Sequence, residues 1–141
     1  MSGSDPEYIL DAQVGYMLRR ASQRHTALFQ SLMPHGLTAT QFAALARLAE
    51  VGATSQNQLG RLTSMDVATI KGVVERLREK GLVEQGADPD DKRRTLVALS
   101  PAAKAMMDAL HTAGAAISDA TLEPLSAAER TRFLHLLSQL T

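Results

Sequence analysis

The sequence predicts a mainly α-helical protein that carries one small β-hairpin. Three observations lead to this fold class. Apolar residues recur at helical spacing through most of the 141 residues, and the chain is 45% hydrophobic but only 4% aromatic, which favours helix-rich packing. Helix-capping patterns precede five of the apolar runs. Two short strand-like runs, 82–85 and 95–99, flank one polar loop.

Residues 6–33 are expected to form one long first helix, which the run Pro34, His35 and Gly36 ends. An apolar stripe follows this helix at spacings of three, four or seven residues. Its members are Ile9, Leu10, Val14, Met17, Leu18, Ala21, Leu28, Phe29, Leu32 and Met33. A first helix this long and this apolar exceeds the needs of a small core, so we expect it to pack against another chain.

The middle of the chain predicts three further helices. Capping boxes at Thr38–Gln41 and Ser55–Gln58 open the first two, while Asp66 caps the third and Gly81 ends it. Their buried faces are expected to hold Phe42, Leu45 and Leu48, then Leu59 and Leu62, then Val67, Ile70, Val73, Val74 and Leu77. Three short helices in this order leave one face of the last helix free for solvent or a ligand.

The hairpin is followed by two more predicted helices. Ser100 caps a helix that has Pro101 at its first position and runs to about Thr121. A capping box at Ser126–Glu129 then opens the last helix. The apolar face of that helix consists of Phe133, Leu136, Leu137 and Leu140. Helices with large apolar faces therefore flank the compact middle on both sides.

The order helix, helix, helix, strand, loop, strand over 38–99 is that of a winged helix-turn-helix. A helix fits the major groove of DNA, and a hairpin beside it reaches the neighbouring minor groove or backbone. We therefore predict DNA contacts from the helix 66–80, its preceding turn and the hairpin loop. The predicted contact residues are Ser64, Asp66, Ala68, Thr69, Lys71, Gly72, Arg76, Lys92, Arg93 and Arg94.

A solvated helix face is the alternative interpretation of the side opposite the buried stripe. Gly72 favours an interface, since a glycine inside a helix costs about 1 kcal/mol relative to alanine. Close approach of another backbone or of DNA would explain a glycine there.

Other chemistries find little support. The four histidines stand apart without metal-ligand spacing, and no glycine-rich phosphate loop or Gly-x-Ser-x-Gly elbow occurs, so we expect no enzyme and no cofactor. The loop 88–99 starts like a calcium loop, but Arg93 and Leu99 stand where glycine and glutamate are needed, so no metal is expected. Without a cysteine, thiol chemistry is excluded.

The N-terminus lacks the features of a signal peptide, and no apolar run approaches the about 20 residues that span a bilayer. We therefore expect a cytoplasmic protein without a membrane partner. The net charge of zero carries no information about nucleic acid by itself, so the charges must be examined locally.

Two segments, "LREKGLV" and "DPDDKRRTLVALSPAA", make the chain similar to the MarR (multiple antibiotic resistance regulator) family of transcription factors. The resemblance implies a homodimer with interleaved terminal helices that binds a pseudo-palindromic operator, with repression favoured. It places the helix 66–80 in the major groove and a wing arginine in the minor groove. Asp91 and Arg93 match the Asp-x-Arg pattern of the family's wing.

The expected organisation is a dimerisation helix over 1–36, a DNA-binding lobe over 37–100 and C-terminal helices over 101–141 that complete the dimerisation domain. A helical dimerisation or protein-interaction module without specific DNA binding is the alternative function. The adjacent bases Lys92, Arg93 and Arg94 argue against it, and a DNA affinity that ignored salt would argue for it.

Within the wing loop, the acidic residues are assigned structural roles. Asp88 and Pro89 are expected to make the turn, since aspartate bonds its own backbone and proline fixes φ. Asp91 is predicted to hold Arg93 in one pose, so that the arginine loses less side-chain entropy on entering a groove.

The resemblance also implies release of DNA by a small molecule, often an aromatic or phenolic acid. We expect an aromatic carboxylate or its thioester between the first helix, the second helix and the helix from 101. The predicted pocket residues are Tyr16, Arg19, Arg20, His25, Phe29, His35 and Phe42. The alternative is that His25 is a core or interface histidine and that the arginines, Arg24 included, are solvated or pair across the dimer.

Overall fold

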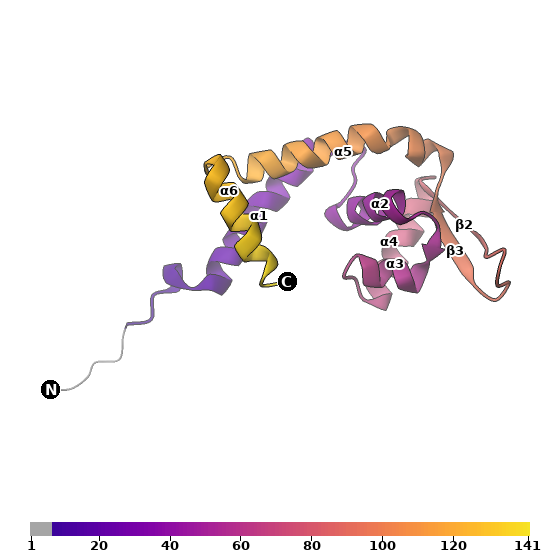
Figure 1. Ribbon diagram of the computed structural model, residues 1–141, viewed down its shortest axis with the longest axis horizontal. Coiled ribbons are helices and arrows are strands. Elements are labelled where there is room, and N and C mark those ends of the chain that lie inside the picture. Colours follow the sequence, from indigo (N-terminus) through magenta and orange to yellow (C-terminus); the bar gives the residue numbers. More distant parts are fainter. Residues whose placement is uncertain (1–6) are drawn as a thin grey trace.

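The computed structural model describes residues 7–141 and confirms the predicted fold class, a mostly helical chain with a small antiparallel sheet (Figure 1). The elements are η1 (Leu10–Ala12), α1 (Val14–Leu32), α2 (Ala39–Val51), β1 (Thr54–Ser55), α3 (Gln56–Leu62), α4 (Val67–Glu79), β2 (Val83–Ala87), β3 (Thr95–Leu99), α5 (Pro101–Thr121) and α6 (Ala127–Ser138). Within this part of the chain, no helix is long and apolar enough to cross a membrane.

The chain forms a winged-helix lobe and a helical arm. The lobe contains α2, α3, α4 and the sheet, whereas α1 and α6 lie together at the other end of the molecule (Figure 1). Helix α5 begins at the lobe and runs out to the arm, where it packs against α1. A displacement of the arm therefore reaches the lobe through α5 and through the α1–α2 connection.

The prediction of one helix over 6–33 is wrong at its N-terminal end, and its first residue lies outside the described part. A 3₁₀ turn at Leu10–Ala12 is followed by an extended residue, Gln13, before α1 begins. The Gln13 side chain donates a hydrogen bond to the Ile9 carbonyl at 2.9 Å, which closes the turn back on itself. Apolar spacing continues through this break, so the periodicity alone could not reveal it.

The helix caps form largely as predicted. Complete capping boxes are present at Thr38–Gln41 and Ser126–Glu129, with both reciprocal hydrogen bonds in each. The predicted box at Ser55 is only half formed: its hydroxyl accepts from the backbone of Gln58 at 3.2 Å. The Gln58 side chain instead accepts from Arg61, at 2.9 and 2.6 Å, and is unavailable for the second bond.

The sheet has the strand order β1-β3-β2, and both pairings are antiparallel. The hairpin register pairs Val83 with Leu99 and Ala87 with Thr95, so the first strand lies at 83–87 rather than at the predicted 82–85. Strand β1 was not predicted, because two residues carry no alternation that could reveal a strand.

The core of the lobe centres on α4, whose predicted residues Ile70, Val73, Val74 and Leu77 are all buried. The fifth predicted residue, Val67, is 69% exposed, which corrects the prediction. The reason is the crossing with α3: a Cβ atom on Gly60 would lie 3.1 Å from Ile70 Cγ2. Close packing therefore begins at Ile70, one turn later than the apolar pattern suggested. The predicted core residues Phe42 and Leu62 are only half-buried.

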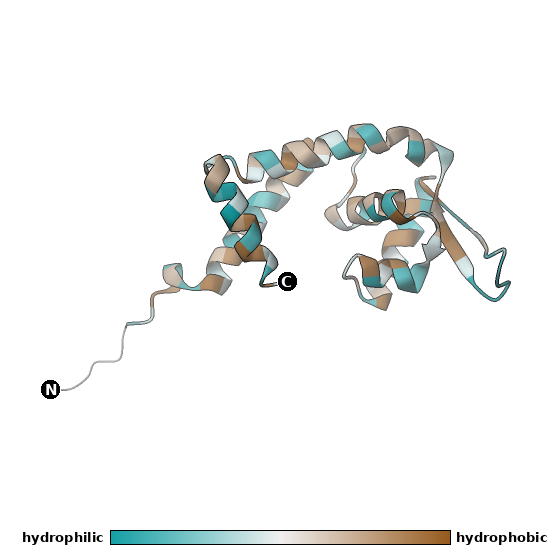
Figure 2. Ribbon diagram, viewed as in Figure 1, coloured by the Kyte–Doolittle hydropathy of each residue, from teal (hydrophilic) through white to brown (hydrophobic). Residues whose placement is uncertain are grey.

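The apolar stripe of α1 and the apolar face of α6 remain mostly uncovered within one chain. Figure 2 shows hydrophobic segments on both helices, at the end of the molecule away from the lobe. The exposed apolar residues of the arm include Tyr8, Ile9, Leu10, Val14, Met17, Leu18, Leu32, Phe133, Leu134, Leu136 and Leu140. Only Phe29 and Met33 of the predicted stripe are buried. A contiguous apolar surface of this kind marks an interaction site.

Candidate functional site

The exposed side of α4 carries most of the residues predicted to contact DNA. Ala68, Thr69, Lys71 and Arg76 are exposed, and Ser64 lies in the turn between α3 and α4 with a φ of 56°. The opposite side of the helix is buried in the core, so its orientation is held by packing. The exposed side is thus a polar surface that carries the cations Lys71, Arg76 and Arg78, with Glu75 and Glu79 towards its C-terminal end.

Asp66, another predicted contact residue, is the N-cap of α4. Its carboxylate accepts a hydrogen bond from the backbone N–H of Thr69 at 2.7 Å. Hydrogen bonds from the Thr69 backbone and hydroxyl lower the pKa of Asp66 below its ordinary value. The negative charge is therefore directed at the helix N-terminus, where the helix dipole favours it.

Gly72 is explained by a neighbour in its own helix. A Cβ atom at this position would lie 3.2 Å from Nη1 of Arg76, and beyond its chain neighbours and its own helix backbone it would meet no other atom within 4 Å. The missing side chain leaves room for the Arg76 guanidinium to lie back along the exposed face. The interpretation that another backbone must approach here is not required, although the face remains open to one.

The loop between β2 and β3 is folded by its aspartates. The Asp88 side chain accepts from the backbone of Asp90 at 2.9 Å, and Arg94 donates its backbone N–H to the Asp91 carbonyl at 2.9 Å. The backbone N–H of Asp88 donates in turn to the Arg94 carbonyl at 3.0 Å, which closes the loop. Figure 2 shows this loop as a hydrophilic tip that extends from the lobe.

Asp91 and Arg93 are in direct contact at the tip. One Asp91 carboxylate oxygen accepts from the Arg93 backbone at 3.0 Å and from its Nε at 3.2 Å. These two bonds lower the pKa of Asp91, the backbone bond first. The Arg93 side chain is nevertheless 92% exposed, against 35% for Asp91. The carboxylate thus orients the arginine without covering it.

Arg61 is a basic residue near the wing that sequence reasoning missed. A recess of about 510 Å³ lies between the start of α3 and the start of β3, and its walls include both Arg61 and Arg94. Its other walls are Ser55, Gln56, Asn57 and Thr95. Because the two arginines are 33 positions apart, only the pairing of β1 with β3 brings them to one recess.

A second group of predicted residues meets where the arm joins the lobe. The rings of His25 and Phe29 have centroids 6.3 Å apart, and Phe29 meets Phe42 edge-on at 6.1 Å. Beside them is a cavity of about 330 Å³. Its walls are His25, Thr26, Phe29, Gln30, Met33, Gly36, Leu37, Thr38 and Ala39. The cavity is therefore mostly apolar, with a few polar groups.

Gly114 of α5 makes room for the aromatic group. A Cβ atom at this position would lie 2.9 Å from the Phe42 ring, closer than real Cβ contacts allow. Helix α5 thus receives the ring against its backbone. No motif of the sequence indicated this role, because it depends on two helices that pack across 72 positions.

The remaining predicted pocket residues lie elsewhere. The Arg19 and Arg20 guanidinium groups stack on the Tyr16 ring, 5.5 and 5.7 Å from its centroid. Arg19 also borders a separate shallow recess that shares Thr26 and Gln30 with the cavity. The structure therefore brings His25, Phe29 and Phe42 together and leaves Tyr16 and the two arginines as a neighbouring cluster on α1.

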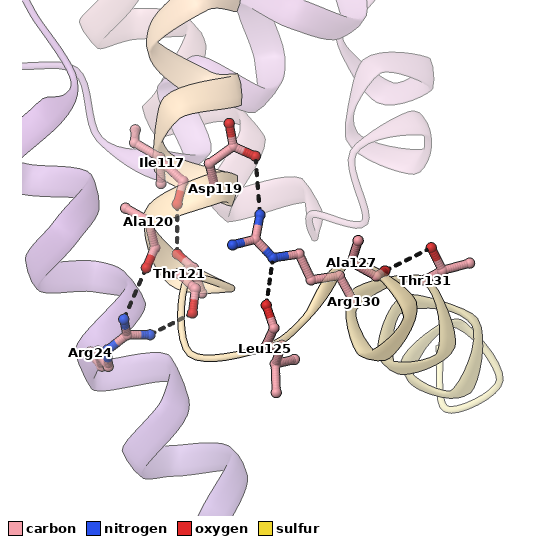
Figure 3. A network of polar contacts seen from close by, with 9 residues as sticks. All are labelled: Arg24, Ile117, Asp119, Ala120, Thr121, Leu125, Ala127, Arg130 and Thr131. Carbon is pink, nitrogen blue, oxygen red and sulfur yellow. Dashed lines mark hydrogen bonds and ion pairs between the residues drawn. The ribbon is translucent and has the colours of Figure 1, made fainter.

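Arg24 has a structural role at the end of α5. Its guanidinium donates to the carbonyls of Ala120 and Thr121 in the last turn of the helix, where carbonyls lack their usual i+4 donors (Figure 3). In the same region Arg130 donates to the Leu125 carbonyl at 3.1 Å and holds the start of α6 to the α5–α6 turn (Figure 3).

His35, another predicted pocket residue, contributes its backbone carbonyl rather than its side chain to the contacts of this region. It adopts a φ of 64° in the turn between α1 and α2, and its side chain is exposed. The Lys80 ammonium group donates to the carbonyls of His35 and Gly36, at 3.2 and 3.3 Å. Since Gly36 lines the cavity and Lys80 caps α4, this contact joins the two candidate sites.

Comparison with known proteins identifies the chain. The model of the MarR family matches residues 35–94. Over 134 residues the chain is 40% identical to the HTH-type transcriptional repressor NicR of Pseudomonas putida, covering 94% of this chain and 85% of the relative. The chain belongs to the MarR family. MarR-family proteins are transcription regulators, so this assignment agrees with the expected absence of an enzymatic role.

Solved MarR-family structures share the whole architecture. A probable transcriptional regulator from Pseudomonas aeruginosa is 53% identical, with a TM-score of 0.92 over 94% of this chain and 100% of that one. BpsR of Bordetella bronchiseptica, whose DNA binding is regulated by 6-hydroxynicotinic acid, is 38% identical, with a TM-score of 0.89 over 96% and 97% of the two chains.

Proposed function

We propose that this MarR-family regulator is a repressor that binds a pseudo-palindromic operator as a homodimer and leaves it when a small aromatic acid binds. The observation that carries the DNA-binding part is the pair Asp91–Arg93, which presents an oriented and exposed arginine at the tip of the wing. An arginine held in this way suits a minor groove while the helix occupies the adjacent major groove.

The proposed contacts divide by role. Thr69 and Lys71, near the start of α4, face base edges or phosphates, and Arg76 faces phosphate. Arg93 enters the minor groove, while Lys92 and Arg94 contact the backbone. Arg61 joins them from α3, since it shares a recess with Arg94. The carboxylates of Asp66, Asp88 and Asp91 accept hydrogen bonds from the protein backbone or from Arg93. They are therefore assigned structural roles rather than contacts with phosphate, which would repel them.

The homodimer rests on the apolar surface of the arm. The exposed faces of α1 and α6 are large for a protein that works alone, and a second copy of the same chain would bury them. A two-fold axis through the arm would present two lobes to two half-sites. We therefore propose that 1–36 and 101–141 form the dimerisation domain and 37–100 the DNA-binding lobe.

The proposed effector is a hydroxylated aromatic acid, bound in the cavity beside His25 and Phe29. The volume of about 330 Å³ lies within the range of small-molecule sites, and the walls combine aromatic and polar groups. The similarity to BpsR supports 6-hydroxynicotinic acid as the first compound to test. Release requires only that the ligand favour a dimer shape that does not fit the operator.

A footprint on the protein's own upstream region, repeated with 6-hydroxynicotinic acid, tests the proposal. We expect a protected two-fold symmetric site, an affinity that falls steeply between low and moderate salt, and loss of protection with the acid. Salt-independent or sequence-independent binding would favour a helical interaction module instead. Protection that persists with every aromatic acid would overturn the effector class but leave the DNA-binding role in place.

A further inference from the structure

The side chain of Thr121 determines which hydrogen bond His25 can make with it. The Thr121 hydroxyl donates to the Ile117 carbonyl at 2.8 Å, as Figure 3 shows. A hydroxyl group has one proton, so the Thr121 oxygen can only accept from a second neighbour. That neighbour is His25 Nδ1, at 2.9 Å. With the hydroxyl proton directed at Ile117, Nδ1 is the donor and carries the proton.

This assignment leaves Nε2 of a neutral His25 as a bare acceptor, because a neutral imidazole carries only one N–H. Among residues 7–141, no group forms a hydrogen bond with Nε2. Every buried side-chain nitrogen or oxygen of these residues has a partner, so the unpartnered Nε2 is accessible. His25 forms part of the wall of the proposed effector cavity, and with Thr121 it also borders the groove between α1 and α6. Among the described residues, no Asp, Glu, Lys or Arg side chain lines that cavity. Whether the imidazole donates or accepts a hydrogen bond therefore affects which ligands bind there.

We infer that Thr121 is a positioning residue that sets the tautomer of His25, so that the cavity selects ligands that donate a hydrogen bond to Nε2. The chemical class is an aromatic acid with a ring hydroxyl or a lactam N–H. An ether at the same ring position offers only an acceptor and leaves Nε2 unsatisfied. This inference rests on the proposed function, since it assigns specificity within the proposed effector site.

The test compares 6-hydroxynicotinic acid, which offers a ring O–H or lactam N–H donor, with 6-methoxynicotinic acid, in which a methyl ether replaces that donor. Their affinities for the full-length protein are measured by calorimetry at about pH 8.5, where free imidazole is neutral. We expect the wild-type protein to prefer the hydroxy compound by about tenfold or more, because an unsatisfied acceptor is costly. In Thr121→Val, where either tautomer can form, the preference falls to within about twofold.

A matched control is available on the same helix. Thr112 also donates to a carbonyl four residues earlier, that of Asp108 at 3.0 Å, but it is exposed and has no bond to a histidine. Thr112→Val removes the same kind of hydrogen bond from α5 and should keep the wild-type preference. Imidazole nitrogen NMR shifts give a second readout: the His25 signals should indicate the Nδ1–H form in wild type and lose that signature in Thr121→Val.

The outcomes separate this inference from the proposed function. If 6-hydroxynicotinic acid releases the operator but Thr121→Val keeps the wild-type preference, the tautomer role is wrong and the effector class stands. An Nε2–H signature in the wild-type protein would also overturn it. If neither probe binds while operator binding is intact, the effector class is wrong and the specificity role fails with it.

Discussion

The wing arginine shows how one carboxylate can help an interaction with a polyanion. Asp91 accepts two hydrogen bonds from Arg93 and leaves the guanidinium almost wholly exposed. The negative charge of Asp91 accepts these hydrogen bonds within the loop, and they lower the pKa of its carboxyl group. The Asp91–Arg93 contact is therefore fully formed above the ordinary pKa of an aspartate. It is lost as the pH falls through the lower pKa that Asp91 has in the folded protein.

Substituting Asp91 should therefore weaken DNA binding even though it removes a negative charge. We expect Asp91→Ala to lower operator affinity by about two- to fivefold, a range set by the modest strength of exposed ion pairs. Fluorescence anisotropy with a labelled operator measures the effect.

Asp90→Ala is the matched control, since it removes the same charge from the same loop. The Asp90 side chain has no recorded bond to Arg93, so this variant should bind operator as tightly as wild type or slightly more tightly. Equal behaviour of the two variants would contradict the positioning role of Asp91.

Among the elements, α4 connects the two candidate sites. Its start is capped by Asp66, its exposed face carries Lys71 and Arg76, and its C-cap residue, Lys80, binds the α1–α2 turn. That turn supplies Gly36 and Leu37 to the cavity wall. A ligand that moves the turn would therefore act on the end of the helix proposed to contact DNA.

Removing the Lys80 contact should weaken the coupling between effector and operator. We expect Lys80→Met to bind operator nearly as wild type, but to need about threefold or more 6-hydroxynicotinic acid for release, within the range that single residues contribute to coupling. Anisotropy titrations of the preformed complex give the release concentration.

Arg78→Met provides the comparison for this experiment. It removes another cation from the last turn of α4, together with a hydrogen bond to Gln85 at 3.0 Å, but does not touch the α1–α2 turn. Release concentrations that change equally in both variants would indicate a general charge effect rather than a specific link.

At the scale of the whole molecule, the apolar surface of the arm supports the proposed dimer. Phe133, Leu134 and Leu136 of α6 are exposed, and the first two border a groove shared with α1. An open groove of about 430 Å³ runs between the two helices, with Leu18 and Phe133 among its walls. Burial of such a surface contributes a transfer free energy of about 25 cal/mol per Å², from which the entropic cost of association is subtracted.

A charge in this surface should break the dimer. We expect Phe133→Glu to lower the mass measured by light scattering from about twice 15.2 kDa to 15.2 kDa. Operator binding should be lost as well, because the monomer no longer has the second DNA-binding lobe. The circular dichroism spectrum of the variant should remain that of a folded helical protein, because Phe133 is 41% exposed within one chain.

Val51→Glu is the control for this variant. Val51 is similarly exposed, at 48%, but lies at the end of α2 in the lobe. It should leave the mass at the dimer value. A wild-type protein that is monomeric at micromolar concentration would refute the dimer outright.

The sequence by itself determined most of the helix starts, the presence of the hairpin and the fold of the wing loop, because these depend on local contacts. The caps at Thr38, Asp66 and Ser126 bond residues three positions away, and Asp91 bonds Arg93 two positions away. Patterns of this range are visible in a linear chain.

Only the tertiary structure decided which polar residues belong to the effector cavity. His25 meets Thr121 across 96 positions, Lys80 reaches the turn at His35 across 45, and Arg24 is occupied by the end of α5 rather than by a ligand. Val67 differs from its predicted environment for the same reason, since the crossing of α3 and α4 leaves it exposed. Apolar spacing records which side of a helix avoids water, whereas the packing of distant helices decides what each side meets.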